Sequence, residues 1–250
     1  MTDVIILAAG KGLRLESNTT KVLNSINGKP MISYLLGSVI NSKIFKKIII
    51  VVSIQNQRKV KNILSKYRCH FIVQKKQIGT ANAVESVLKS AIKLDDNIMV
   101  LLGDHPLISF KTIKKIAEIH YKNNAKISMI TAKVPNYDGI YKNFYYDGRI
   151  KRNEKSEIIG IIEPSNATNN EMKIREINPS LYIFNTKWLK DNIGKIKINA
   201  KKKEYYLTDI MQIAYNQNYK IFSVTVNAIE CFGVNTQEQL KQIQNVMKKL

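Results

Sequence analysis

A short apolar run near the start of the chain, Val4 to Leu7, leads directly into a loop of small and basic residues at 8–14. The run is rich in β-branched residues and has no helical period, so we predict a buried central strand. Two glycines, Gly10 and Gly12, open the loop backbone to a ligand, and Arg14 adds positive charge beside it. The spacing matches neither the P-loop nor the dinucleotide fingerprint. It favours phosphate binding, although many glycine-containing βα turns bind nothing.

Strand-like and helix-like segments alternate through the first half of the chain, which predicts an α/β fold with a largely parallel sheet. The expected strands lie at 47–53, 71–74, 98–102 and 127–134, and the expected helices at 31–40, 57–66, 81–91 and 112–121. Ligands collect outside the carboxyl ends of the central strands, so Asp104 should lie beside Ala9 and Gly10. An aspartate there suits a divalent cation or a simple turn. His105 shows no orienting partner and is expected to be a turn residue.

Beyond Pro135 the pattern changes to short strands separated by glycine and polar residues. The expected elements are strands within 147–150, 158–163, 174–185 and 221–226, a polar loop at 166–173, a helix at 207–215 and a terminal helix to 250. We predict a single domain in which residues 1–134 form one lobe. Residues 135–235 form a second lobe of antiparallel pieces at the edge of the same sheet, and 236–250 form the C-terminal helix.

Lysine gives this chain of 250 residues a formal net charge of +21. A large positive charge is common in proteins that bind nucleic acid. Here, however, the lysines are spread along the whole length instead of forming one basic stripe. We therefore expect no nucleic-acid partner, because a general attraction for phosphorylated small molecules accounts for the charge.

The sequence also bears on the compartment. No apolar run approaches the roughly 18 residues needed to cross a bilayer, and the N-terminus lacks the basic and apolar regions of a signal peptide. We expect a cytoplasmic protein with no membrane partner. Cys69 and Cys231 lie far apart and are expected to be reduced.

A set of motifs in a fixed order resembles one family. These motifs are L-A-A-G-K-G-L-R at 7–14, K-V-L at 21–23 with G-K-P-M at 28–31, Q-x-x-Q-I-G-T-A-N-A-V at 74–84, L-L-G-D-H-P-L-I at 101–108, D-G-R-I at 147–150, I-I-E at 161–163, E-I-N at 176–178, E-Y-Y-L-T-D-I at 204–210 and G-V-N at 233–235. Over nearly its whole length the chain resembles the uridyltransferase half of the bacterial bifunctional N-acetylglucosamine-1-phosphate uridyltransferase/glucosamine-1-phosphate acetyltransferase. The first motif is shared by many sugar nucleotidyltransferases, whereas E-Y-Y-L-T-D, Q-I-G-T-A and G-V-N point to this branch.

The resemblance implies a Rossmann-like, GT-A-related nucleotidyltransferase fold with a mixed, mostly parallel sheet. It also implies transfer of uridylyl from UTP to N-acetylglucosamine 1-phosphate, with release of pyrophosphate. In this family pattern Arg14, Lys21 and Asp104 are catalytic, and Asp104 and Asn235 hold a catalytic Mg²⁺. The implied substrate-binding residues are Leu7, Ala8, Ala9, Gly10, Lys21, Gln74, Gly79, Thr80, Leu102, Gly103, Asp104 and Asn235, with Gly148, Glu163, Asn178, Glu204, Tyr206 and Thr208 around the sugar.

Departures from the family pattern leave alternatives open. Thr20 stands where the family has proline, Leu102 where an aromatic residue is common, and Ser180 where it has glycine. The acceptor could therefore be another sugar 1-phosphate, and a module that binds nucleotide without catalysis is a third interpretation. The family's acetyltransferase half, a left-handed β-helix of hexapeptide repeats, has no counterpart here. We expect acetyl transfer to come from a separate protein or from a part missing from this sequence, and the oligomeric state is not indicated.

Overall fold

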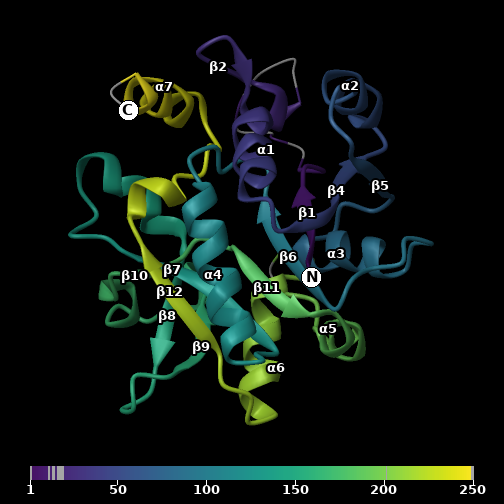
Figure 1. The fold of residues 1–250 in the computed structure, drawn as a ribbon. Coiled ribbons are helices and arrows are strands. Elements are labelled where there is room, and N and C mark those ends of the chain that lie inside the picture. Colours follow the sequence, from purple (N-terminus) through teal and green to yellow (C-terminus); the bar gives the residue numbers. More distant parts are fainter. Residues whose placement is uncertain (1, 11, 13–14, 16–19, 201, 249–250) are drawn as a thin grey trace.

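The strand predicted at the N-terminus lies in the interior of a ten-stranded mixed sheet (Figure 1). The computed structural model describes residues 2–10, 12, 15, 20–200 and 202–248. Strand β1 (Thr2–Leu7) runs parallel to both neighbours, β4 (Phe45–Ser53) and β6 (Asn97–Leu102). The strand order is β5-β4-β1-β6-β11-β7-β10-β8-β9, with β12 beside β7. The other strands are β5 (His70–Gln74), β7 (Ile127–Lys133), β8 (Gly148–Arg152), β9 (Ile158–Ile162), β10 (Glu176–Asn178), β11 (Tyr182–Asn185) and β12 (Phe222–Val226).

Helices cover both faces of the sheet. Val4 and Ile6 of β1 join one hydrophobic cluster, whereas Ile5 joins the other, and all three are fully buried. Alternate strand residues point to opposite faces, so burial on both faces explains why this run is apolar throughout. The first cluster includes α1 (Met31–Ser42), α2 (Gln57–Ile63), α4 (Phe110–Lys122) and α7 (Gln237–Met247). The second includes α3 (Thr80–Leu88), α5 (Thr186–Asn192) and α6 (Ile210–Asn216).

Most expected elements are present with small changes at their ends, and the mixed α/β sheet is confirmed. The helix expected at 57–66 ends at Ile63, and the one expected from 207 begins with a 3-10 turn over Leu207–Asp209. The 3-10 segment Gly139–Tyr146 and helix α5 were not predicted. Helix α5 is capped by Asn185, whose side chain accepts a hydrogen bond from the backbone N–H of Trp188 (3.0 Å). Asparagine is a favoured N-cap, and this cap was the overlooked sequence signal.

Strand β11 lies in the interior of the sheet, and not at its edge as predicted. It pairs antiparallel with both β6 and β7. Strands β8, β9 and β10 do form an antiparallel edge, whereas β12 runs parallel to β7. Because β11 joins the strand that ends just before Asp104, the second half of the chain is built directly onto the central strands.

The C-terminal helix α7 packs beside the N-terminal region near β2 (Ser25–Ile26), which pairs with β3 (Lys29–Pro30) (Figure 1). The side chain of Gln244 donates to the Ser25 carbonyl oxygen (3.2 Å), and that of Gln237 donates to the Leu15 carbonyl oxygen (2.5 Å). These bonds hold both ends of α7 close to the chain that follows β1.

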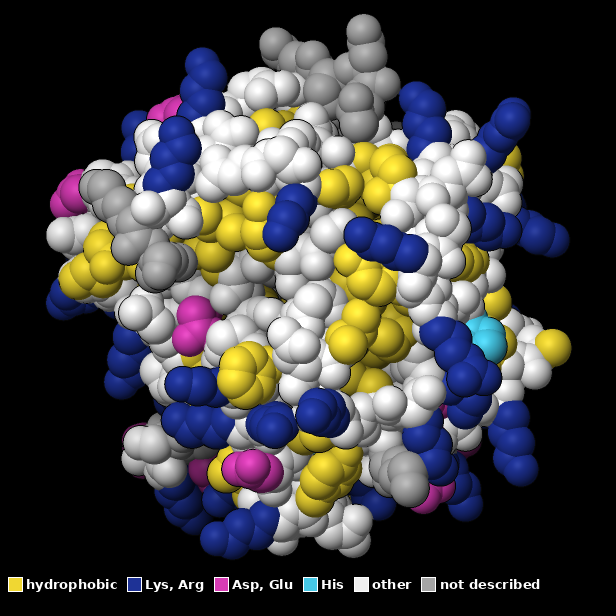
Figure 2. Space-filling model, turned by 45° about the horizontal axis from the view of Figure 1, so that its top comes forward, with side chains coloured by type: hydrophobic (Ala, Val, Ile, Leu, Met, Phe, Trp, Pro, Cys, Tyr) yellow, Lys and Arg dark blue, Asp and Glu magenta, His cyan; other side chains and the backbone are white. Residues whose placement is uncertain are grey.

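The surface carries its charge as the composition indicated. Figure 2 shows Lys and Arg side chains scattered over one face of the molecule among uncharged atoms. Among the helices that the structure describes, none combines the length and the apolar character that crossing a membrane requires. The described residues contain no left-handed β-helix.

Candidate functional site

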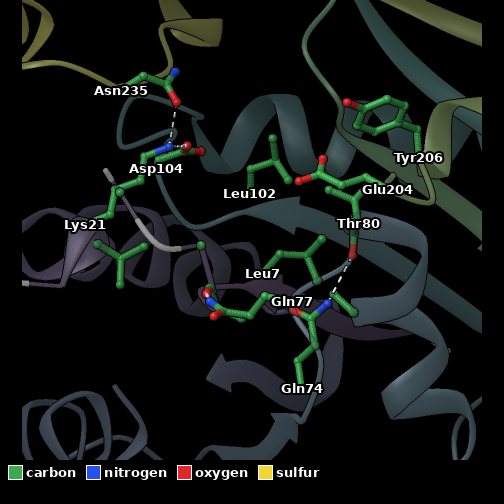
Figure 3. Close-up of a pocket in the computed structure, with 16 residues that line it drawn as sticks. Leu7, Lys21, Gln74, Gln77, Thr80, Leu102, Asp104, Glu204, Tyr206 and Asn235 are labelled. Carbon is green, nitrogen blue, oxygen red and sulfur yellow. Dashed lines mark hydrogen bonds and ion pairs between the residues drawn. The ribbon is translucent and has the colours of Figure 1, made fainter. Parts of the chain in front are cut away.

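A cavity of about 510 Å³ opens where β1, β5 and β6 end (Figure 3). Leu7 and Leu102, the last residues of β1 and β6, lie opposite each other in the register. The loops after these two strands therefore lie side by side, as predicted for the carboxyl ends of central strands. The cavity is lined by Leu7, Ala9, Gly10, Gly12, Lys21, Val22, Gln74, Gln77, Gly79, Thr80, Ala83, Leu102, Asp104, Glu204, Tyr206 and Asn235.

Side chains from neighbouring loops hold the backbone of the loop after β1. Asn56 donates from Nδ2 to the Ala8 carbonyl oxygen (2.8 Å), and Gln77 donates from Nε2 to the Ala9 carbonyl oxygen. The Ala8 side chain itself is buried, so its contribution is to the shape of the loop. Gly10 is exposed at the cavity, with no atom within 4 Å of where a Cβ would lie. The loop thus presents an uncrowded backbone to a ligand.

Gly12 lies against the base of Lys21. Its φ is +63°, and a Cβ built there would lie 2.7 Å from the Lys21 Cβ. A glycine is therefore required both by the backbone conformation and by the close approach of the lysine. Arg14, the other predicted catalytic cation, lies outside the residues that the structure describes.

The segment after β5 joins the cavity to the chain near Tyr205. Gln74 is buried and donates from Nε2 to the Gly79 carbonyl oxygen (3.1 Å). Thr80 accepts a hydrogen bond at Oγ1 from the Leu207 backbone N–H (2.9 Å), and the Tyr205 backbone N–H donates to the Ile78 carbonyl oxygen (2.9 Å). These bonds bring Glu204 and Tyr206 to the cavity wall near Thr80 (Figure 3).

Lys21, Asp104 and Asn235 meet inside this cavity. The Lys21 ammonium donates to Asp104 Oδ2 and to Asn235 Oδ1, the latter at 2.7 Å (Figure 3). The Lys21 and Asp104 side chains are each only 13% exposed. Burial by itself raises the pKa of the Asp104 carboxyl, but the Lys21 charge and the hydrogen bonds to Asp104 outweigh it and hold that pKa far below its usual range. Two oxygen ligands from opposite halves of the chain thus already converge on one positive charge.

His105 has an orienting partner, contrary to the sequence-based expectation. Its Nδ1 lies 2.8 Å from Asp104 Oδ1, so the imidazole and Lys21 contact different oxygens of one carboxylate. The ring also packs on Gly233, where a Cβ would lie 3.0 Å from His105 Cε1. Sequence inspection missed this role because the histidine's partner is its own neighbour and its packing contact is a distant glycine.

A second cavity of about 140 Å³ shares Leu102, Asp104 and Asn235 with the first. The two cavities therefore meet at the Asp104–Asn235 pair. The other walls of the second cavity are mostly polar and comprise His105, Asn143, Phe144, Asp147, Asn178, Pro179, Ser180 and Gly233. Of these walls only Asn178 was predicted as a site residue.

Asp147 carries the second carboxylate of this smaller cavity. Burial raises its pKa to about 7 although the charges of His105 and Arg149 lower it, and the nearby charges of Glu163 and Asp104 add to the rise. The buried Arg149 side chain donates to the backbone carbonyl oxygens of Asp147 and Tyr145, the latter at 2.8 Å. Arg149 therefore holds the backbone that presents Asp147 to the cavity.

The remaining residues predicted around the sugar form one cluster beside the cavities. Thr208 donates from Oγ1 to Glu163 Oε1 (3.1 Å). A Cβ at Gly148 would lie 3.5 Å from the same Glu163 oxygen and 3.8 Å from the Asn178 Cβ. Burial raises the pKa of the Glu163 carboxyl. The fold thus brings together Gly148, Glu163, Asn178 and Thr208, whose roles in binding stay predictions.

Ser180, which stands in place of the family's glycine, adopts a backbone conformation that glycine favours. Its φ is +60°, and its backbone N–H donates to Asn178 Oδ1 (3.1 Å). The amide Nδ2 of Asn178 lies 2.7 Å from the Tyr182 hydroxyl. The turn is therefore formed with serine, at a conformational cost, and the serine lines the second cavity.

Most of the predicted substrate-binding residues line the main cavity. Gly103 does not line the cavity but supports it, because its backbone N–H donates to the Leu7 carbonyl oxygen (2.9 Å). Its close neighbours leave little room for a side chain at this position. Gln77 lines the cavity but was not predicted as a binding residue. Its place within Q-I-G-T was the one available indication. Asn143 was missed because the stretch before Asp147 matches no motif, and Asp147 was missed although it begins the D-G-R-I motif.

The site offers a limited set of ligands for a metal ion. Among residues 2–10, 12, 15, 20–200 and 202–248, no group of three or more His, Cys, Asp and Glu side chains is arranged to hold one. Asp104 and Asn235 supply two oxygens, which already surround the positive charge of Lys21. Mg²⁺ commonly takes one or two protein ligands and completes its shell with water and substrate phosphates. The pair therefore fits a cation that also binds a phosphate ligand.

The fold is shared with two solved structures. CMP:2-keto-3-deoxy-manno-octonic acid synthetase complexed with CTP superposes with a TM-score of 0.71 at 15% identity, covering 99% of this chain and 98% of the other. The 4-diphosphocytidyl-2C-methyl-D-erythritol synthase from Anaerococcus prevotii gives 0.66 at 16% identity, with the same coverage. At these identities the likeness concerns the fold alone.

Comparison of sequences identifies closer relatives. Bifunctional protein GlmU from Clostridium tetani is 33% identical over 248 residues, and that from Thermosipho africanus is 37% identical over 246 residues. Each alignment covers 98% of this chain but only 52% and 50% of the respective relative, so the chain spans about half their length. A probable UDP-N-acetylglucosamine pyrophosphorylase from Acanthamoeba polyphaga mimivirus is 34% identical over 253 residues, covering 98% of this chain and 96% of the viral protein.

The family assignment rests on the part of the chain that contains β1, β6 and the loops after them. Residues 4–151 match the MobA-like NTP transferase domain. The matched region is more than half of the chain and includes Lys21 and Asp104. This protein therefore belongs to the MobA-like NTP transferase family.

Proposed function

We propose that this protein transfers a uridylyl group from UTP to N-acetylglucosamine 1-phosphate, forming UDP-N-acetylglucosamine and pyrophosphate. The observation that carries the proposal is the meeting of two cavities at Asp104 and Asn235, where Lys21 supplies a positive charge. The choice of substrates is supported by the viral pyrophosphorylase, which this chain matches over nearly the whole length of both proteins. The GlmU relatives support the same choice through their matching half.

In this proposal residues 1–134 provide the nucleotide side of the site. The backbone at 7–10 faces the nucleoside, and Gln74, Gly79 and Thr80 contact the uracil. The buried Gln74 amide and the Gly79 carbonyl are already bonded to each other, so the base would meet a preformed edge. Lys21 and Arg14 would neutralise the triphosphate and the departing pyrophosphate.

Residues 135–235 would provide the acceptor side. Gly148, Glu163 and Asn178, with Glu204, Tyr206 and Thr208, would surround the sugar. The sugar phosphate must reach the Asp104–Asn235 pair from this side to approach the α-phosphorus of UTP. The second cavity, whose volume is about 140 Å³, has room for a substituent of the acceptor but not for a whole nucleotide.

The reaction needs positioning and charge neutralisation more than proton transfer. The nucleophile is a phosphate oxygen whose second pKa is about 6, so it is largely ionised at neutral pH without a base. Holding two anions in line and cancelling their charge can then supply most of the acceleration. A buried lysine at the meeting point of the cavities suits this requirement.

The oxygens of Asp104 and Asn235 are of the type that Mg²⁺ prefers, and we infer that they hold it. When bound, Mg²⁺ would supply positive charge at the phosphates of both substrates. His105 would keep the Asp104 carboxylate oriented through its contact with Oδ1. Lys21 would exchange its contacts with Asp104 and Asn235 for contacts with the phosphates of UTP.

A turnover assay tests this proposal. We expect pyrophosphate release from UTP, N-acetylglucosamine 1-phosphate and Mg²⁺, with much slower reaction when CTP or GTP replaces UTP. Glucose 1-phosphate and glucosamine 1-phosphate serve as alternative acceptors, and a preference for either would assign another sugar. These alternative acceptors are tested because Asp147 and Ser180 line the second cavity. Binding of UTP without turnover of any acceptor would instead identify a non-catalytic module.

A further inference from the structure

Gln239 contacts two different parts of the site through one side chain. It lies in the first turn of α7, and its Oε1 accepts hydrogen bonds from the backbone N–H groups of Asn235 (2.6 Å) and Thr236 (3.1 Å). Its Nε2 donates to Asn143 Oδ1 (3.2 Å). Both ends of the amide are therefore occupied, and each end reaches a different element.

The first contact fixes the backbone that carries Asn235. Thr236 accepts a hydrogen bond at Oγ1 from the Gln239 backbone N–H (3.2 Å), which completes a capping box at the start of α7. Asn235 immediately precedes this cap and directs its Oδ1 to Lys21. The orientation of the Asn235 amide in the cavity thus depends on where the first turn of α7 holds its backbone.

The second contact reaches the acceptor side. Asn143 belongs to the 3-10 segment Gly139–Tyr146 and lines the second cavity. It also donates from Nδ2 to Gln242 Oε1 (2.6 Å), one turn further along α7. The wall of the second cavity is therefore attached to the helix that holds Asn235.

We propose that Gln239 is a positioning residue that couples the cation-binding Asn235 to the acceptor-side wall at Asn143. The inference rests on the proposed function, and it assigns to Gln239 a role beyond capping a helix. Partners that orient a metal ligand commonly contribute 10–100-fold to metal affinity. Here the same partner also holds the wall that the acceptor meets, so cation binding and acceptor binding are tied to one amide.

The contact of Gln239 with the backbone at Asn235 and Thr236 can be separated by substitution from its contact with Asn143. In Gln239→Glu the carboxylate can still accept from the N–H groups of Asn235 and Thr236, because glutamate also forms capping boxes. It cannot donate to Asn143 Oδ1. Gln239→Ala loses both contacts. Gln242→Glu is the control for the added charge: it places the same charge one turn away and keeps an acceptor for the Asn143 Nδ2–H, and it loses only the exposed Gln242 bond to Glu238 Oε1 (3.3 Å).

We expect the three variants to differ in Mn²⁺ affinity, in Tm and in kcat/KM for the acceptor. Gln239→Ala should weaken Mn²⁺ binding in the presence of UTP about tenfold and lower the Tm by about 2–4 °C. Gln239→Glu should keep the Tm and Mn²⁺ affinity close to those of Gln242→Glu. Its kcat/KM for the acceptor should nevertheless fall about tenfold, with the KM for UTP unchanged.

A Gln239→Glu protein with the same acceptor kcat/KM as Gln242→Glu would show that the residue only caps α7. Unchanged Mn²⁺ affinity in Gln239→Ala would show that Gln239 does not position Asn235 for cation binding. If the wild type binds UTP with Mn²⁺ but turns over no sugar phosphate, the proposed function fails. The Mn²⁺ titration of Gln239→Ala then still tests whether Gln239 positions Asn235, because that measurement needs no acceptor, and unchanged affinity would overturn the coupling.

Discussion

The nucleotide side and the acceptor side of this site are built by different means. On the nucleotide side, loops at the ends of parallel strands are held by buried side chains such as Asn56 and Gln74, which bond to backbone oxygens. On the acceptor side, antiparallel strands and a 3-10 segment present the carboxyls of Asp147 and Glu163, and burial raises the pKa of both. On the nucleotide side the buried polar side chains already have hydrogen-bond partners before any ligand binds. On the acceptor side the two buried carboxyls keep the electrostatic cost of their burial.

This difference indicates where affinity and specificity would come from. A backbone surface that is already bonded loses little entropy on binding, so it suits a ligand that all members of a family share. Buried carboxyls with few favourable contacts gain most from a ligand that supplies hydrogen-bond donors. We therefore expect nucleotide binding to depend on loop geometry, and acceptor choice to depend on individual side chains.

The strongest test removes the carboxylate at which the two sides meet. Asp104→Ala should lower kcat by at least about 10³-fold, or roughly 4 kcal/mol of transition-state stabilisation, because it removes charge organisation at both substrates. Circular dichroism should show the fold retained, but the Tm should fall, because the largely buried Lys21 and His105 lose the carboxylate that they contact. Asp96→Ala, an exposed position next to the opposite end of β6, is the control and should keep normal turnover. Near-normal rates in Asp104→Ala would remove this residue from the mechanism.

A substitution at Gly79 tests whether the nucleotide side depends on backbone geometry. Its φ is +110°, and a Cβ would lie 2.6 Å from the Tyr205 backbone nitrogen. Gly79→Ala should therefore reduce the free energy of unfolding by about 3 kcal/mol and weaken UTP binding. Denaturant unfolding and calorimetry would measure both effects.

The matched control for Gly79→Ala is Gly37→Ala within α1, where no atom lies within 4 Å of the added Cβ. Alanine in a helix interior should stabilise the protein by about 0.5–1 kcal/mol. If Gly79→Ala bound UTP normally, the nucleotide side would be more adaptable than the comparison of the two sides implies.

The features that the sequence predicts also differ between the two sides. Apolar strands and glycine loops have local patterns, so β1, β6 and the position of Asp104 beside the first loop could be anticipated from them, whereas the role of Lys21 is implied only by the family resemblance. The insertion of β11 between β6 and β7 could not, because pairing order depends on contacts between distant segments. Asn143 and Gln239 were missed for the same reason, since each acquires its role from a partner that only the fold supplies. The partner of His105 is its sequence neighbour Asp104, but its packing on Gly233 depends on the fold.

A buried histidine on the nucleotide side, within residues 1–134, tests whether the two sides unfold together. His120 on α4 donates from Nε2 to Asn97 Oδ1 of β6 (3.0 Å), and its Nδ1 accepts from the Ser128 hydroxyl of β7 (2.9 Å). Burial, aided by the charge of Lys126, lowers its pKa to about 4. The neutral ring is therefore the form that the folded protein accommodates.

The lowered pKa of His120 sets the direction of the pH effect on stability. Above pH 6.5 the ring is neutral in both states, and its contribution is fully present. As the pH falls from about 6.5 to 4, the unfolded chain binds the proton first, so up to about 3 kcal/mol is lost. The difference in unfolding free energy between wild type and His120→Gln should shrink over this range, measured by urea denaturation at each pH. A constant difference would contradict the assignment, and two separate transitions would show that the sides unfold independently.

The smallest expected effect concerns strain on the acceptor side. Ser180 has a φ of +60°, which costs an ordinary residue about 1–2 kcal/mol relative to glycine. Ser180→Gly removes that cost but adds about 0.4–1 kcal/mol of unfolded-state entropy, so a net gain of about 0.5 kcal/mol in unfolding free energy is expected. Ser180→Ala keeps the strain and should not be stabilised. A loss of stability in Ser180→Gly would mean that the serine hydroxyl, 3.4 Å from Asn178 Nδ2, contributes more than the backbone strain costs. The acceptor side would then be better satisfied than its buried carboxyls suggest, and the contrast with the nucleotide side would narrow.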